Sequence, residues 1–476
     1  MREEPVGHPM LSKEYAFAQL GVLVAVVASG PTSDVVQLGL LLWALRGPAP
    51  AIQALSLFVV VRGFNPILAA HGSLGGTLAW ALPLAVSARL LPMASAPCFR
   101  WMVPLWTFCA IAALCSVMGS PALAVSLMKV ATLALVASGV LIGCLKLSHA
   151  ETRQLGIWLW TLAIVVAASS IALLVRPGIA HLPNSTLLNG ILNQSQALGS
   201  FMAPFAAASL VQWLLARRST NTRQLAIWVA IMACTLLTLS RTAALAAVLG
   251  MAFAVMGGSS RDRRTSSADI GRVAGIVVAL AFGLLILELA TGSVLHGLSS
   301  FALKGGAGTL EESFQASRGG LVTSQWHNFL TSPIYGHGFG VYADGDFPSG
   351  IRTFMGIPVS APVEKGVLPT AVLEETGLLG FVAFAWLVYS LVAGVWRRAP
   401  HAVVAMLIAC LFVNLGEAIL LSPGGFGLHI WLLIGWCLRA AQLSTAPATT
   451  TAGAAAATTP VPPGGPRRRP FPNLLD

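Results

Sequence analysis

Arginines beside apolar segments are the residues of this chain best suited to chemistry. Arg241 lies in TLLTLSRTAAL between two apolar runs, Arg62 lies at the edge of another in VVVRGFNP, and Arg318 precedes a glycine-rich polar stretch. A charge at hydrocarbon depth is costly, so such a residue is a functional candidate unless it snorkels to the lipid headgroups. Guanidinium groups bind phosphate oxygens through paired hydrogen bonds and keep their charge. These positions therefore favour an anionic, membrane-held ligand such as a lipid diphosphate.

The stretch SPIYGHGFG, residues 332–340, surrounds His337 with Gly336, Gly338 and Gly340. Glycine lets a backbone approach a ligand closely, so the turn is a candidate binding loop. The Gly-Lys-Ser/Thr ending of a nucleotide-binding phosphate loop is missing from it. The preceding residues, ASRGGLVTSQWHNFLT, follow a helical period and predict an amphipathic helix, whose polar residues could equally form a solvated face.

Other charges also occur inside apolar runs. We expect Lys129 to pair with a neighbour or to snorkel, and Glu288 and Glu417 each to pair with an arginine. A proton-coupled transporter would need acidic residues near the middle of the membrane, whereas nearly all acidic residues here fall in loops or near the ends of apolar runs.

The elements that position these residues must be membrane helices. Of the 476 residues, 56% are hydrophobic and only 9% are charged. Apolar runs of roughly 16–25 residues follow one another along the chain, and backbone groups in lipid must be satisfied within the segment, so the runs predict an all-α polytopic integral membrane protein of about 12–14 transmembrane helices. The predicted spans lie near 15–31, 33–46, 50–68, 76–92, 101–117, 121–143, 154–175, 197–216, 224–240, 242–257, 273–291, 369–395, 401–421 and 427–443.

Basic residues set the expected orientation. Arginine clusters follow the eighth, tenth and twelfth predicted spans, near 217–223, 261–272 and 397–398, which marks these loops as cytoplasmic. Both termini are then cytoplasmic, and one large loop, 292–368, between the eleventh and twelfth spans faces the periplasm of a bacterial inner membrane. The net charge of +11 is explained by these loops and by the tail, so we expect no nucleic-acid partner.

The predicted organisation has four parts. A transmembrane bundle occupies 1–291, starting with an uncleaved signal anchor, and a periplasmic loop subdomain with site residues occupies 292–368. C-terminal transmembrane helices occupy 369–443, and the Ala-, Thr- and Pro-rich tail, 444–476, is expected to be disordered. The seven cysteines lie in or beside apolar runs without metal or disulfide spacing, so we expect buried, unpaired thiols and no metal.

The motifs LSRTAAL, SRGGLVTSQWHNFLTSPIYGHGFG and LEETGLLG together resemble the O-antigen ligase and O-antigen polymerase superfamily over roughly residues 185–440. The matching positions include Ser240 with Arg241, Arg318 before the glycine turn, and Glu375 in the last motif. NGILNQSQALGS, which contains Asn193, resembles the family's asparagine-containing segment. The family's His-Asn pair is replaced here by Gly366 and a valine, which weakens the case for a ligase.

This resemblance implies a metal-independent, GT-C-like glycosyltransferase without a cofactor. Its donor would be a glycan on undecaprenyl diphosphate in the lipid bilayer, and its acceptor either another glycan repeat unit or lipid A–core. Envelope polysaccharide assembly proteins are possible partners. Arginines that hold the diphosphate would stabilise the leaving group, with Arg241 and Arg318 first and Arg352 third.

A sugar hydroxyl also needs a base within reach. Glu364, beside the altered His-Asn position, and His337 are the candidates, although Glu364 could instead form a salt bridge with Lys365. Glu375 is expected to orient an arginine, with Asn193 and Arg62 in supporting positions. We prefer a polymerase to a ligase; a transporter or flippase is the alternative from another class, followed by a non-catalytic assembly scaffold.

Overall fold

A computed structural model describes a chain built mainly of helices. The described residues are 12–69, 75–181, 187–215, 222–257, 312, 315–348, 350–354, 357–360, 363 and 365–445. Among them, six helical stretches are long and apolar enough to cross a membrane. These are α5 (Ala96–Gly119), α6 (Leu123–Leu145), α7 with η2 (His149–Ala172 and Leu173–Val175), α9 (Ser195–Leu215), α16 (Leu368–Val395) and α18 (Phe426–Thr445). The predicted class, a helical membrane protein, is therefore supported, while the number of spans stays a prediction.

Shorter helices occupy most of the other predicted spans. They are α1 (Lys13–Ala28), α2 (Gly30–Ala44), α3 (Pro48–Arg62), α4 (Gly75–Leu90), α10 (Thr222–Leu237), α11 (Arg241–Gly257) and α17 (His401–Phe412), with the short turns η1 (Leu91–Met93), α8 (Pro177–Ala180) and η6 (Val413–Leu415). Local sequence sets several of the boundaries. Ser29 and Thr32 form a capping box that starts α2 directly after α1, and Ser148 with Glu151 does the same for α7. The predicted span at 273–291 and the tail from residue 446 lie outside the described residues.

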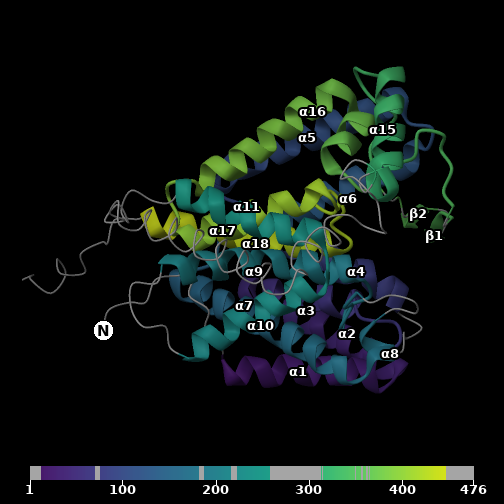
Figure 1. The fold of residues 1–476 in the computed structure, drawn as a ribbon. Helices are drawn as coiled ribbons and strands as arrows, with labels where there is room; N and C mark the ends of the chain where they lie inside the picture. The colour runs from purple at the N-terminus through teal and green to yellow at the C-terminus, as the bar shows by residue number, and fades with distance from the viewer. Residues whose placement is uncertain are drawn as a thin grey trace, which may run out of the picture.

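The helices form one bundle whose interior holds α9 and α18 (Figure 1). Small residues allow its helices to approach closely. A Cβ atom added to Gly250 of α11 would lie 2.7 Å from the Ala405 carbonyl oxygen of α17 and 3.0 Å from the Ala207 side chain of α9. Such contacts between small residues are typical of helices that associate in lipid, where apolar burial alone does not drive packing. All seven cysteines are buried and unpaired, as predicted.

The described part of the large loop lies across one end of the bundle. It contains a π-helical turn, η5 (Gln315–Gly319), the amphipathic helix α15 (Gly320–Thr331), and a hairpin of β1 (Arg352–Phe354) and β2 (Ile357–Ser360), whose antiparallel register pairs Phe354 with Ile357. Figure 1 shows α15 near the end of the paired helices α5 and α16, with the hairpin at the same end. We call this the loop end of the bundle.

Candidate functional site

Helix α16 is broken at Gly377, and the glycine-rich turn of the loop fills the break. Gly377 has φ 60° and ψ −163°, so the helical hydrogen bonds across it are lost. The freed Glu374 and Glu375 carbonyls accept hydrogen bonds from the backbone N–H groups of His337 and Gly338, each at 2.9 Å. In return, the N–H groups of residues 378 and 379 donate to the carbonyls of residues 333 and 334, at 2.9 and 3.2 Å. These two carbonyls and two N–H groups next to the break therefore have partners outside the helix, as backbone groups in a membrane helix require.

The glycines of the turn make this insertion possible. Gly336, Gly338 and Gly340 all have positive φ angles of 67–96°. A Cβ atom at Gly336 would lie 2.5 Å from the Glu375 backbone, and one at Gly338 would lie 2.4 Å from the Ser120 side chain. At these two glycines the backbone closely approaches the protein itself, and ligand binding by them stays a prediction. Gly340 alone of the three lines the polar cavity described below.

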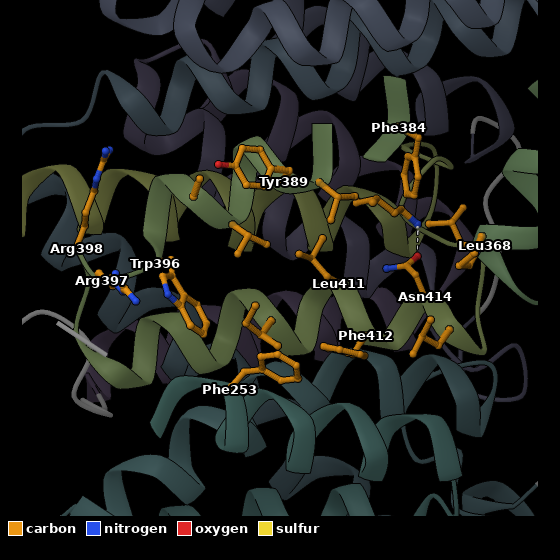
Figure 2. Close-up of a pocket in the computed structure, with 17 residues that line it drawn as sticks. Phe253, Leu368, Phe384, Tyr389, Trp396, Arg397, Arg398, Leu411, Phe412 and Asn414 are labelled. Atoms are coloured by element: carbon orange, nitrogen blue, oxygen red, sulfur yellow. Dashed lines mark hydrogen bonds between the residues drawn. The ribbon is translucent and has the colours of Figure 1, made fainter. Parts of the chain in front are cut away.

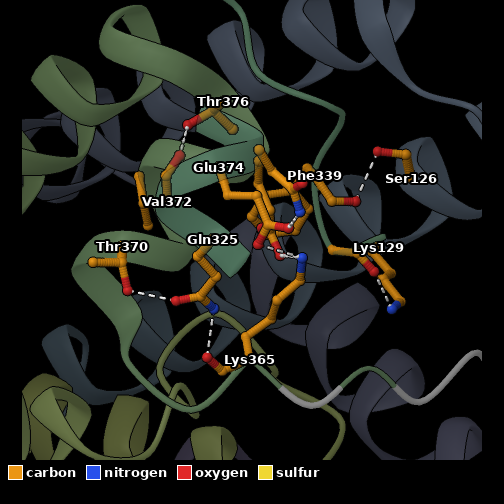
Figure 3. Close-up of polar contacts among 12 residues, drawn as sticks. Ser126, Lys129, Gln325, Phe339, Lys365, Thr370, Val372, Glu374 and Thr376 are labelled. Carbon is orange, nitrogen blue, oxygen red and sulfur yellow. Dashed lines mark hydrogen bonds and ion pairs between the residues drawn. The ribbon is translucent and has the colours of Figure 1, made fainter. Parts of the chain in front are cut away.

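A buried charged cluster lies beside the break and joins the first part of α16 to Lys365, which precedes the helix (Figure 3). Lys365 Nζ lies 2.7 Å from a Glu374 carboxylate oxygen and 3.9 Å from one of Glu375. All three side chains are buried, with at most 8% of each exposed. Asn328 of α15 donates to the other Glu374 oxygen at 2.8 Å, and the Gln325 amide donates to the Lys365 carbonyl. Buried charges are stable only when paired and hydrogen-bonded, a condition that Lys365 and Glu374 meet.

A polar cavity of about 370 Å³ opens beside this cluster. Its lining includes Lys365 and Glu375, Lys129 of α6, and residues 418 and 421–425 of the loop between α17 and α18. Lys129 donates to the Gly340 carbonyl, so its ammonium group is fixed at the cavity wall (Figure 3). Two lysines and a carboxylate thus face one space near the loop end. Such a set can bind an anionic group and accept a proton from a hydroxyl.

Arg318 lies next to this region but forms an ion pair. Its guanidinium donates to a Glu417 carboxylate oxygen at 2.6 Å, with 21% of each side chain exposed. The prediction that Glu417 pairs with an arginine is therefore confirmed. Arg241 begins α11, and the next residue, Thr242, packs against Gly416 beside Glu417. The fold thus brings the segment of Arg318 and the segment of Arg241 close together, because both lie beside residues 416 and 417.

Ser240 caps the start of α11, because its hydroxyl accepts the Ala243 N–H at 3.4 Å. Asn193 and Arg62 come from adjoining segments: the Asn193 N–H donates to the Gly63 carbonyl at 2.8 Å. The Asn193 side-chain oxygen is buried and accepts no hydrogen bond from the described residues. Ligand binding by these residues stays a prediction.

His337 is held by other contacts. Its Nε2 atom lies 2.9 Å from both the Thr331 hydroxyl and the Asn328 carbonyl, and the residue does not line the cavity. Glu364 and the Arg352 side chain lie outside the described part of the structure. Glu375 was expected to orient an arginine, but its ion-pair partner among the described residues is Lys365.

The cavity contains Lys129, for which the sequence did carry a signal. Lys129 is a charge inside an apolar run, which is the same feature that singled out Arg241. Glu374 belongs to the LEETGLLG motif and Lys365 precedes it, but their pairing depends on the break at Gly377, which apolar periodicity does not reveal.

An apolar groove adjoins the polar cavity. It has a volume of about 830 Å³ and lies between α16 and α17, with Phe253 of α11 in its wall (Figure 2). Leu368 lines both the groove and the cavity. The two spaces together therefore suit an amphiphile with a polar headgroup and an apolar chain.

No protein-family model matches the sequence, and no curated protein shows significant similarity to it. The resemblance to O-antigen ligases and polymerases stays a prediction, and the chemistry of the site is what bears on function.

Proposed function

We propose that the protein is a bacterial envelope glycosyltransferase that elongates a glycan carried on undecaprenyl diphosphate. The observation that carries the proposal is the polar cavity with Lys129, Lys365 and Glu375, which meets the apolar groove at Leu368. A lipid-linked sugar diphosphate has the matching parts: a chain for the groove, an anionic diphosphate for the cations, and a sugar beside the carboxylate.

The reaction forms one bond and breaks another. The acceptor hydroxyl oxygen bonds to the anomeric carbon of the donor sugar, the bond from that carbon to the diphosphate oxygen breaks, and undecaprenyl diphosphate leaves. Glu375 takes the hydroxyl proton in this proposal, while Lys129 and Lys365 stabilise the charge that develops on the diphosphate. In this proposal Arg318 and Arg241 hold the outer part of the headgroup, Arg318 by exchanging Glu417 for phosphate. The loss of the family's His-Asn pair favours polymerisation over transfer to lipid A–core.

The test uses purified protein with lipid-linked repeat units, and it follows glycan length. Wild-type protein is expected to lengthen the glycan, and Glu375→Gln to reduce the rate by on the order of 100-fold or more, as for loss of a general base. Glu151→Gln, in the capping box of α7 away from the cavity, is the matched control and should keep the wild-type rate. Arg241→Ala should abolish transfer while the protein still inserts into membranes. Transfer to lipid A–core without elongation would instead indicate a ligase.

A transporter is the second candidate, and one observation favours it. Broken membrane helices with buried charged residues near the break are common at the substrate sites of secondary transporters, and α16 has both features. Uptake of the lipid-linked glycan by proteoliposomes, with no new glycosidic bond formed, would replace the transferase proposal with this one.

A further inference from the structure

The α16–α17 groove has a second polar end, at the side of the bundle opposite the loop end. There the chain leaves α16 through Trp396, Arg397 and Arg398, and α17 begins at His401. Figure 2 shows both arginines and Trp396 at one end of the groove, with Leu368 and Asn414 at the other. Tryptophan at the end of a membrane helix is typical of the headgroup level, so this end of the groove lies where lipid phosphates lie.

The backbone at the two arginines forms a defined turn, and their charges are not neutralised by a described residue. Arg397 has a φ angle of 60°, which a residue with a side chain rarely adopts, so the connection is a specific, tight turn. Among the described residues, neither Arg397 nor Arg398 takes part in an ion pair. A pair of unneutralised guanidinium groups at the mouth of an apolar groove is complementary to the phosphate of an anionic lipid.

The groove also has the right length on this side. The helical stretch from Phe384 to Trp396 rises about 18 Å, close to the ~15 Å half-thickness of a bilayer's hydrocarbon core. Apart from the Tyr389 hydroxyl, its wall between these residues is apolar and includes Val388, Val392 and Ala393. One leaflet's acyl chains can therefore fill this half of the groove without reaching the part beside Leu368.

We propose that this half of the groove is a binding site for an anionic glycerophospholipid. Its phosphate lies on Arg397 and Arg398, and its acyl chains lie between α16 and α17. The positive-inside rule assigns this end to the cytoplasmic leaflet. The site occupies the half of the groove away from Leu368 and the polar cavity, and none of the residues assigned to the transfer reaction lines it, so it does not depend on the proposed activity.

Native mass spectrometry of detergent-purified, delipidated protein tests the proposal, with phosphatidylglycerol and phosphatidylethanolamine of identical acyl chains as probes. Wild-type protein is expected to retain phosphatidylglycerol in preference. Arg397→Gln with Arg398→Gln should weaken phosphatidylglycerol binding roughly fivefold for each arginine removed. The matched control, Arg46→Gln with Arg89→Gln, removes the same charge from exposed positions outside the groove and should bind as the wild type does.

A second variant tests the groove itself. Ala393→Trp fills the apolar space and should reduce the binding of both lipids, whereas Ala110→Trp, at an exposed position on α5, should not. Equal retention of the two lipids by the wild type would overturn the proposal in favour of unselective surface lipid. Wild-type phosphatidylglycerol retention by the arginine double variant, or by Ala393→Trp, would overturn it as well.

Discussion

At the scale of single residues, the Lys365 ammonium group balances the carboxylates of Glu374 and Glu375 in a buried setting. Removing one partner of a buried pair leaves an uncompensated charge, which costs far more than the pair itself contributes. Removing the Lys365 side chain should therefore lower the stability of the fold more than removing either glutamate, because it leaves two buried carboxylates without their cation.

This asymmetry predicts an order of stabilities. Lys365→Met should lower the free energy of unfolding by about 3–5 kcal/mol. Glu374→Gln keeps an oxygen for the Asn328 amide and leaves Lys365 beside Glu375, so it should cost less, about 2 kcal/mol. The double variant, Lys365→Met with Glu374→Gln, should be more stable than Lys365→Met alone, because it has one unpaired buried carboxylate fewer. The temperature at which each variant loses its monodisperse peak in size-exclusion chromatography gives this order. A Lys365→Met protein as stable as the wild type would contradict the pairing.

At the scale of elements, the inserted turn and the two parts of α16 form one unit. Gly377 needs its left-handed backbone, and a Cβ atom there would lie 2.3 Å from the Ile334 backbone. The turn cannot withdraw without leaving the carbonyls of Glu374 and Glu375 unpaired. The geometry of the cavity wall therefore depends on a contact between segments far apart in the sequence.

Gly377→Ala should consequently disrupt the site as well as the helix. We expect a loss of more than ~2 kcal/mol from backbone strain and steric overlap together, seen as a lower midpoint of thermal unfolding. Gly21→Ala is the matched control, because Gly21 lies in helix α1 with no heavy atom within 4 Å of the added Cβ, and alanine there should be neutral or slightly stabilising. If the two substitutions had equal effects, the insertion of the turn would not be structurally important.

The same elements show what the sequence could and could not predict. Apolar runs located the helices well, because length and hydropathy are local properties. The run at 401–421 was predicted as one span, yet α17 ends at Phe412 and η6 at Leu415. There the Asn414 side chain donates to the Cys410 carbonyl and accepts from the N–H groups of residues 419 and 420, which turns the chain. A single polar side chain in an apolar run is not enough to predict such a turn from the sequence.

The site was predicted less well, for a related reason. Arg318 was identified by its charge, but the sequence does not reveal that it reaches Glu417, because that contact joins distant segments. The break in α16 was hidden for the same reason: the partners of its free backbone groups are supplied by the glycine turn. Charge type and glycine spacing mark candidate residues, whereas their partners are set by tertiary structure.

At the scale of the whole molecule, the proposals require a definite orientation. The polar cavity must face the periplasm, where the proposed donor and acceptor meet, and Arg397 with Arg398 must face the cytoplasm. The alternating course of the helices and the positions of the arginine clusters both favour this arrangement.

Labelling of single introduced cysteines with a membrane-impermeant maleimide tests the orientation. All seven native cysteines are buried, so their background labelling should be low. Thr331→Cys places an exposed thiol at the end of α15, and His149→Cys places one at the start of α7 on the opposite side of the bundle. In intact spheroplasts Thr331→Cys should be labelled and His149→Cys protected; in inverted membrane vesicles the pattern should reverse. The opposite pattern would put the polar cavity on the cytoplasmic side, where it could act on neither an exported lipid-linked glycan nor its periplasmic acceptor.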